Sequence, residues 1–197
     1  MKIIIFGANG KIGKALVKQF SNQHDLVKVG RSSGDVQADY TDEQSIINMY
    51  QSIGHFDALC CVAGRDSQFV DIKSLNIEHF QYGVERKLLG QVRLVLEGLK
   101  YINDGGSFTL SSGYLNQYPN SFSLATSPFN SFVNNFAQSM SGFLPRNIRL
   151  NVVSPSPVVE KAEYGKVTAE MVAMDFITSV EENETGKVFK VWNMNVD

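Results

Sequence analysis

The sequence alternates from end to end between short, β-branched apolar runs and longer amphipathic segments. The short runs predict strands at Lys2–Phe6, Leu26–Val29, Val36–Ala38, Asp57–Val62, Ser107–Ser111, Arg149–Val153 and Lys187–Trp192. The amphipathic segments predict helices at Lys11–Phe20, Asp42–Ser52, Glu78–Tyr101, Ser123–Phe143 and Thr168–Val180. Several of the strands are apolar almost throughout, as strands covered on both faces are. The alternation therefore predicts an α/β protein with a doubly wound parallel sheet of about seven strands and helices on both faces.

Length and charge limit the organisation of the chain and its partners. The chain has 197 residues and shows neither a linker nor a repeat, so we expect a single domain over residues 1–197. A formal net charge of −2 and scattered lysines and arginines favour neither nucleic acid nor a membrane surface as a partner. The apolar run at the N-terminus is too short for a signal sequence, and no run reaches the ~18–20 apolar residues of a membrane span. We therefore expect a cytoplasmic protein.

The cysteines and histidines do not suggest a cross-link or a metal site. Cys60 and Cys61 are adjacent within an apolar run, which disfavours a disulfide between them and predicts buried thiols. His24, His55 and His79 lie far apart and lack the spacing of metal ligands. We therefore predict no metal site.

A glycine-rich loop follows the first predicted strand and leads directly into the first predicted helix. Gly7, Gly10 and Gly13 are spaced Gly-x-x-Gly-x-x-Gly, with Asn9, Lys11 and Ile12 between them. Glycines allow the backbone to turn tightly and to approach a pyrophosphate closely, while the helix N-terminus offers free N–H groups to the anion. In this position the loop predicts a Rossmann fold in which these six residues contact a dinucleotide. The alternative interpretation is a tight turn without a ligand.

The end of the second predicted strand indicates which dinucleotide is bound. Domains specific for NAD carry an acid here that binds the ribose 2′-hydroxyl. This chain has Arg31 instead, followed by Ser32 and Ser33. A guanidinium beside two hydroxyls suits a 2′-phosphate, so the sequence favours NADP as the cofactor. A solvated arginine in a turn is the alternative.

Several short motifs resemble those of the short-chain dehydrogenase/reductase family. They are Gly7 to Gly13, Asp39-Tyr40-Thr41-Asp42, Cys61-Val62-Ala63-Gly64, Lys87-Leu88-Leu89-Gly90, Leu110-Ser111-Ser112-Gly113 and Asn151-Val152-Val153-Ser154-Pro155-Ser156-Pro157. The resemblance extends from residue 1 to about residue 192. It implies that Asp39 holds the adenine amino group, next to Tyr40. It also implies that Ala63, Gly64 and Pro155 belong to the cofactor site.

The chain departs from the family at the Tyr-x-x-x-Lys motif. Aligned on the sequence that follows the motif, Phe122 stands in place of the tyrosine and Thr126 in place of the lysine. Neither side chain can donate a proton to a reduced carbonyl, and loss of a general acid typically costs ~10²–10⁴ in rate. Tyr114 and Tyr118 follow the fifth predicted strand and would offer a phenol from another direction. Packed loop residues are the simpler interpretation of both.

Two residues remain as candidates for the chemistry, Ser112 and Lys87. The resemblance implies that Ser112 polarises a carbonyl. It also places Lys87, at the position of a family asparagine, on a helix next to the one that carries Thr126. We predict that the Lys87 ammonium lies between Ser112 and Thr126, within a hydrogen bond of either residue or of a bound ribose. There it would act as the missing proton donor, because burial lowers the pKa of a lysine. The alternative is a lysine whose stem covers apolar surface while its amine reaches solvent.

The sequence leaves two functions open. The first is an NADP-dependent oxidoreductase of atypical short-chain type that acts on a small carbonyl or alcohol substrate. The second is a catalytically silent NADP-binding sensor or interaction protein with the same fold. For either function we expect a homodimer formed by the helices Glu78–Tyr101 and Ser123–Phe143, because the second carries a stripe of aromatic residues.

Overall fold

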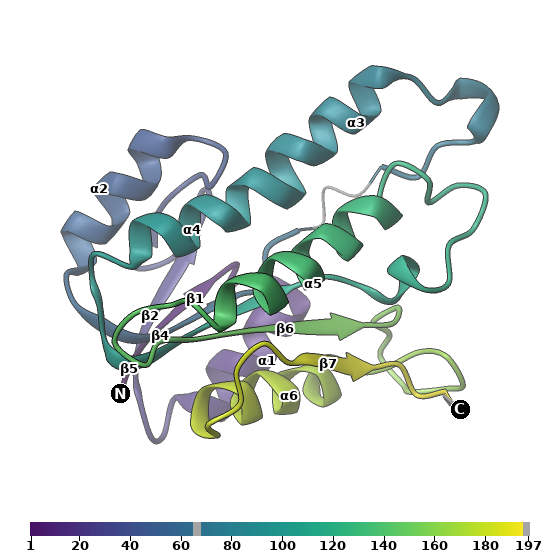
Figure 1. Cartoon of the computed structure of the whole chain (residues 1–197). Helices are drawn as coiled ribbons and strands as arrows, with labels where there is room; N and C mark the ends of the chain where they lie inside the picture. The colour runs from purple at the N-terminus through teal and green to yellow at the C-terminus, as the bar shows by residue number, and fades with distance from the viewer. Residues whose placement is uncertain (65–67, 195–197) are drawn as a thin grey trace.

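The computed structural model describes residues 1–64 and 68–194 and is built around one sheet (Figure 1). Its strands are β1 (Lys2–Phe6), β2 (Asp25–Gly30), β3 (Val36–Gln37), β4 (Phe56–Cys61), β5 (Ile102–Ser111), β6 (Arg149–Pro155) and β7 (Val188–Val191). They lie in the order β3-β2-β1-β4-β5-β6-β7, and every neighbouring pair is parallel. The predicted doubly wound parallel sheet is therefore confirmed. Its order reverses direction between β1 and β4, where such sheets bind ligands at the carboxyl ends of their strands.

Helices cover both faces of the sheet. They are α1 (Lys11–Phe20), α2 (Glu43–Ile53), α3 (Ile77–Gly83), a π-helical stretch (Val84–Leu89), α4 (Gly90–Gly98), α5 (Ser127–Ser141) and α6 (Ala169–Glu181). Residues of α2, α4 and α5 share one hydrophobic core with one face of the sheet, and residues of α1 and α6 share a second core with the other face. Figure 1 shows α1 and α6 together on one side, with the remaining helices opposite.

Two predicted helix boundaries were wrong. The single helix expected over Glu78–Tyr101 is a helical run that changes to π-helical geometry at Val84–Leu89 and ends at Gly98. The helix expected from Ser123 begins only at Ser127, because the residues before it form turns in which the amides of Thr126 and Ser127 both donate to the Ser123 carbonyl. Pro128, in the first turn of α5, favours a helix that starts at this point.

Two glycines let the long helical run approach its neighbours closely. A Cβ on Gly90 would collide with the Tyr40 ring, and a Cβ on Gly83 would collide with the Phe129 ring of α5. The run therefore lies against the segment after β3 at one point and against α5 at the other. This packing holds the intervening π-helical stretch, which includes Lys87, close to the carboxyl ends of the strands.

Three further observations concern the cysteines, membrane spans and metal ligands. Cys60 and Cys61 are both buried, as expected from their apolar run. Among residues 1–64 and 68–194, no helix is both long enough and apolar enough to cross a membrane. Within the same residues no cluster of three or more histidines, cysteines or acids is arranged to hold a metal ion.

Candidate active site

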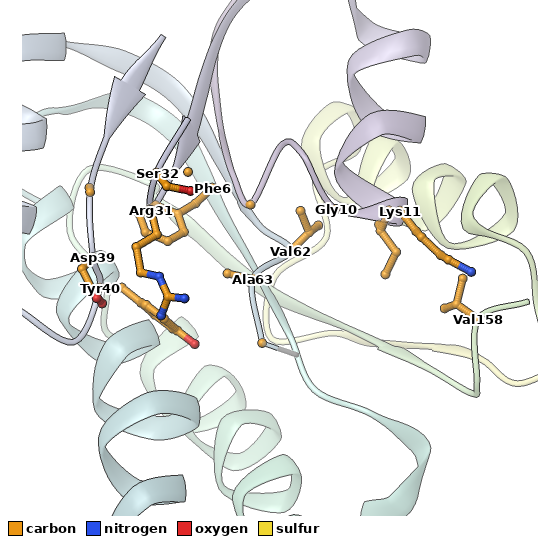
Figure 2. A pocket seen from close by; sticks show the side chains of 15 residues that line it. Phe6, Gly10, Lys11, Arg31, Ser32, Asp39, Tyr40, Val62, Ala63 and Val158 are labelled. Atoms are coloured by element: carbon orange, nitrogen blue, oxygen red, sulfur yellow. The ribbon is translucent and has the colours of Figure 1, made fainter. Parts of the chain in front are cut away.

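A cavity of about 680 Å³ lies at the carboxyl ends of β1, β2 and β4 (Figure 2). Its walls come from the ends of these strands, from the loops that follow them, and from the segments after β3 and β6. They are formed by Phe6, Gly7, Gly10, Lys11, Ile12, Gly30, Arg31, Ser32, Ala38, Asp39, Tyr40, Val62, Ala63, Gly64 and Val158. The cavity thus lies where the strand order reverses, and its volume suits a nucleotide-sized ligand. We call it the nucleotide cavity.

The glycine loop forms the floor of the nucleotide cavity by packing backbone against backbone. Gly7 has a φ of 96°, and a Cβ at this position would lie 2.8 Å from the Ala63 amide nitrogen. A Cβ on Gly13 would collide with the carbonyl oxygen of Gly7. Gly10 precedes the first turn of α1, and no side chain caps the free N–H groups there. Backbone donors at a helix N-terminus and a surface clear of Cβ atoms together fit a pyrophosphate.

Two residues predicted to touch the cofactor, Asn9 and Gly13, are not among the residues that line the nucleotide cavity. The Asn9 side-chain amide donates to Ser33 Oγ at 2.7 Å, so it ties the glycine loop to the turn after β2. Gly13 is buried, where its lack of a side chain allows α1 to pack on the loop. Both residues therefore shape the nucleotide cavity without lining it.

The wall opposite the glycine loop carries the residues expected to select the cofactor. In Figure 2 the Arg31 side chain extends along the wall that Asp39 and Tyr40 form. The Asp39 carboxylate accepts hydrogen bonds from the Thr41 amide at 3.0 Å and the Thr41 hydroxyl at 2.7 Å. Burial alone would raise the pKa of Asp39, but these bonds and the charges of Arg31 and Arg86 outweigh burial and lower it. Asp39 is therefore a fixed anion that can accept a hydrogen bond from an amino group.

A second cavity, of about 290 Å³, meets the nucleotide cavity at Gly64, which lines both. It is surrounded by the ends of β5 and β6 and by the segment before α5. Its lining residues are Gly64, Phe69, Lys87, Ser112, Gly113, Tyr114, Leu115, Asn120, Thr126, Asn130, Pro155, Ser156 and Pro157. The structure thus places the predicted cofactor residue Pro155 in this second cavity. We call it the reaction cavity.

Lys87, Ser112 and Thr126 all line the reaction cavity. Lys87 Nζ lies 3.2 Å from the place that a Cβ on Gly64 would take, so the amine is at the junction of the two cavities. Ser112 Oγ is buried and has no hydrogen-bond partner among the described residues. The three residues that were predicted to lie together therefore line one cavity.

The environment of Lys87 changes its acidity. Burial lowers the pKa of Lys87 to about 8, against a smaller opposing effect of the Cys61 thiol. No hydrogen bond joins the amine to Ser112 or Thr126: Ser112 Oγ has no partner among the described residues, and the Thr126 hydroxyl donates to the Gln68 carbonyl at 3.1 Å. The expected hydrogen bonds to these two side chains are thus not formed. The Lys87 amine instead lines the reaction cavity, with a pKa closer to neutral pH than that of an ordinary lysine.

The aromatic residues considered as proton donors have different positions. Phe122, at the family's tyrosine position, is 51% exposed and lines neither cavity. Tyr118 packs edge-on against Trp192, with ring centroids 5.7 Å apart. Tyr114, by contrast, lines the reaction cavity. Among the described residues, Lys87 and Tyr114 are therefore the two proton donors to compare.

Several residues of the site were not predicted from the sequence. Val158 lines the nucleotide cavity, and Phe69 and Asn130 line the reaction cavity. No local pattern marked these three. Gln91 lies behind the reaction cavity, and it did carry a signal: it is a polar residue on a buried helix face, four residues after Lys87.

Solved structures with the same architecture cover almost the whole chain. A protein of Listeria innocua, lin1944, is 34% identical, with a TM-score of 0.92 over 98% of this chain and 100% of that one. A small-chain dehydrogenase is 25% identical, with a TM-score of 0.87 over 99% of this chain and 97% of that one. The chain belongs to the short-chain dehydrogenase/reductase family. This confirms the resemblance drawn from the motifs.

A third solved structure extends the fold match. A small-chain dehydrogenase in complex with NADPH superposes with a TM-score of 0.88 at 24% identity, over 98% of this chain and 97% of that one. No protein-family model matches the sequence, and a search of curated proteins finds no match either.

Proposed function

We propose that this short-chain dehydrogenase is a single-domain, NADP-dependent oxidoreductase that interconverts a small carbonyl compound and its alcohol. One observation carries the proposal: Lys87 and Ser112 share a small cavity that joins the nucleotide cavity at Gly64. An amine and a hydroxyl beside the expected position of a nicotinamide are the groups needed to bind and protonate a carbonyl oxygen.

The residues of the nucleotide cavity fit a dinucleotide phosphate. The glycine loop offers backbone N–H groups to the pyrophosphate, Asp39 accepts from an adenine amino group, and Arg31 with Ser32 faces a 2′-phosphate. When bound, NADPH supplies the hydride. Pro155, at the carboxyl end of β6, lines the space where the reacting end of the cofactor would meet the substrate.

The reaction cavity supplies the proton. The Ser112 hydroxyl, which has no partner among the described residues, donates a hydrogen bond to the carbonyl oxygen and polarises it. As the carbonyl carbon gains a hydride, the Lys87 ammonium transfers a proton to the oxygen and becomes a neutral amine. The product alcohol forms, and solvent reprotonates Lys87. A pKa of about 8 leaves the ammonium form dominant at pH 7 while keeping it a far stronger acid than an ordinary lysine.

The deciding experiment measures NADPH consumption with a panel of small aldehydes and ketones, alongside calorimetry of NADPH binding. Turnover that depends on Lys87 supports the oxidoreductase. Tight NADPH binding without turnover of any substrate supports the second candidate, a silent NADP-binding sensor. That candidate is favoured by Phe122 and Thr126, because neither residue can act as the family's proton donor and Phe122 lies outside the reaction cavity.

The cofactor preference provides a separate prediction. We expect NADPH to bind at least ~10-fold more tightly than NADH, about the contribution of one charged contact. Substitution of Arg31 by alanine should remove most of this preference and leave NADH affinity within about twofold, because NADH lacks the 2′-phosphate. Calorimetry with both cofactors checks this. Equal affinities in the parent protein would contradict the assignment of NADP.

Assembly is the third element of the proposal. The surface of α5 carries Phe132, which is 44% exposed and stacks on Phe136, while Phe143 just beyond the helix is 88% exposed. We expect this face, with that of α4, to pack against a second copy in a two-fold dimer. Sedimentation should show a dimer at micromolar concentration and a monomer for Phe132→Glu. A monomeric parent protein would refute the assembly.

A further inference from the structure

The amide of Gln91, on α4, makes three hydrogen bonds in the interior of the protein. Its nitrogen donates to the Ser111 carbonyl at 3.0 Å and to the Lys87 carbonyl at 3.1 Å, and its oxygen accepts from the Ser111 amide at 2.9 Å. The side chain is only 1% exposed. One buried amide thus joins the backbone of Lys87 to the residue that precedes Ser112.

The two hydrogen bonds to Ser111 take the place of a missing strand partner. Thr109 of β5 pairs with Cys60 of β4, but β4 ends at Cys61. Two residues beyond Thr109, the backbone N–H and C=O of Ser111 face the same side of the strand and would be left without a partner. The Gln91 amide offers them one donor and one acceptor, as a neighbouring strand would. The Ser111 hydroxyl also donates to the Cys61 carbonyl at 2.6 Å, which links β5 to the last residue of β4.

The third hydrogen bond acts on the helix. Lys87 lies within the π-helical stretch Val84–Leu89, where the usual backbone pairing of an α-helix is interrupted. Gln91 is one turn further along, and its side chain holds the Lys87 carbonyl. The Gln91 amide thus holds both the π-helical backbone at Lys87 and the end of β5 at Ser111.

We infer that Gln91 is a positioning residue, whose amide fixes the separation of the Lys87 amine from the Ser112 hydroxyl across the reaction cavity. This inference rests on the proposed function of Lys87 and Ser112. Gln91 touches neither cavity and acts only through the backbone of the two residues it joins. A shift of ~1 Å in a catalytic group can cost as much as ~10²-fold in rate. Loss of the Gln91 hydrogen bonds should therefore lower turnover more than it lowers the binding of NADPH or substrate.

The test compares Gln91→Leu with a matched control, Thr109→Val. Gln91→Leu removes the two hydrogen bonds to Ser111 of β5 and the one to Lys87. Thr109→Val also removes a buried side-chain hydrogen bond from β5, but this one runs to Ser179 of α6 on the opposite face of the sheet, at 2.7 Å. For Gln91→Leu we expect kcat for carbonyl reduction to fall about 10- to 100-fold, with KM and NADPH affinity within about twofold. For Thr109→Val we expect kcat to stay within about twofold of the parent.

A second measurement does not depend on turnover. NMR titration of ¹³C-methylated lysines, with the Lys87 resonance identified from Lys87→Arg, follows the amine directly. In Gln91→Leu its titration midpoint should rise towards that of an ordinary lysine, because a loosened backbone lets the ammonium reach water. The Cys61 thiol acts on the charge of Lys87, and the other titratable groups that line a cavity together with Lys87 are His79 and Tyr82 on α3 and Tyr114 after β5. None of them is altered by the substitution.

The outcomes separate this inference from the proposed function. Unchanged kcat and unchanged Lys87 titration in Gln91→Leu would overturn the inference, as would an equal loss in Thr109→Val. If the parent protein reduces no carbonyl, the proposed function fails, and the titration alone decides whether Gln91 positions Lys87. If Gln91→Leu does not fold, Gln91→Met keeps the length of the side chain, removes the same hydrogen bonds and is read in the same way.

Discussion

Lys87→Met is expected to lower kcat for NADPH-dependent carbonyl reduction by about 10²–10⁴-fold, the typical contribution of a general acid. Methionine keeps an unbranched apolar stem of similar reach but cannot donate a proton. NADPH affinity should stay within about twofold, because Lys87 lines the reaction cavity and not the nucleotide cavity. The free energy of unfolding should not fall, since the substitution removes an enclosed ammonium that is costly to bury.

The pH profile of the parent protein gives the same prediction in another form. Lys87 must be protonated to act as an acid, and its pKa is lowered to about 8. In the direction of reduction, kcat should therefore be level on the acidic side of this value and fall about tenfold per pH unit above it. Alcohol oxidation needs the neutral amine as a base, so its rate should rise over the same range. In Lys87→Met, both the fall in the reduction rate and the rise in the oxidation rate over this pH range should be lost.

Tyr114→Phe is the control, because this residue lines the same cavity and the change removes only its hydroxyl group. We expect its kcat to stay within about twofold of the parent. A large loss in Tyr114→Phe with none in Lys87→Met would transfer the role of proton donor to the tyrosine. Parent-like kinetics in both variants would show that neither residue donates the proton.

Gly13→Ala is expected to destabilise the protein by about 1–3 kcal/mol, the range typical of an overpacked interior. The added methyl group would collide with the backbone of Gly7 and Ala8, which cannot rotate away as a side chain would. The glycine loop must therefore shift, so NADPH affinity should fall by at least about tenfold, a loss of 1.4 kcal/mol or more. Urea unfolding and calorimetry measure the two effects.

Gly142→Ala provides the matched control for this prediction. Gly142 follows α5 with an ordinary φ of −75°, and a Cβ there would have nothing within 4 Å. Its stability should change by less than about 0.5 kcal/mol, as is usual for surface substitutions. If Gly13→Ala is as stable as Gly142→Ala and binds NADPH like the parent, the glycine loop is not packed as described.

The sequence alone determined the class of fold and the position of the nucleotide cavity, because both follow from local patterns. Strands and helices differ in the period of their apolar residues, and this period is read over a few consecutive residues. The glycine loop is also local, since strand, turn and helix follow one another within residues 2–20. Arg31 was visible for the same reason, because it directly follows β2.

The tertiary structure alone decided how the reaction cavity is assembled. No sequence pattern shows that β4 ends before β5 does, so none shows that Ser111 needs the Gln91 amide as a partner. The π-helical stretch is likewise invisible in the apolar period, and it arises where the helix packs on Tyr40 and Phe129. These contacts join residues far apart in the chain, and they bring Lys87 to Ser112. The chemistry proposed for this protein therefore depends on packing that only the folded chain provides.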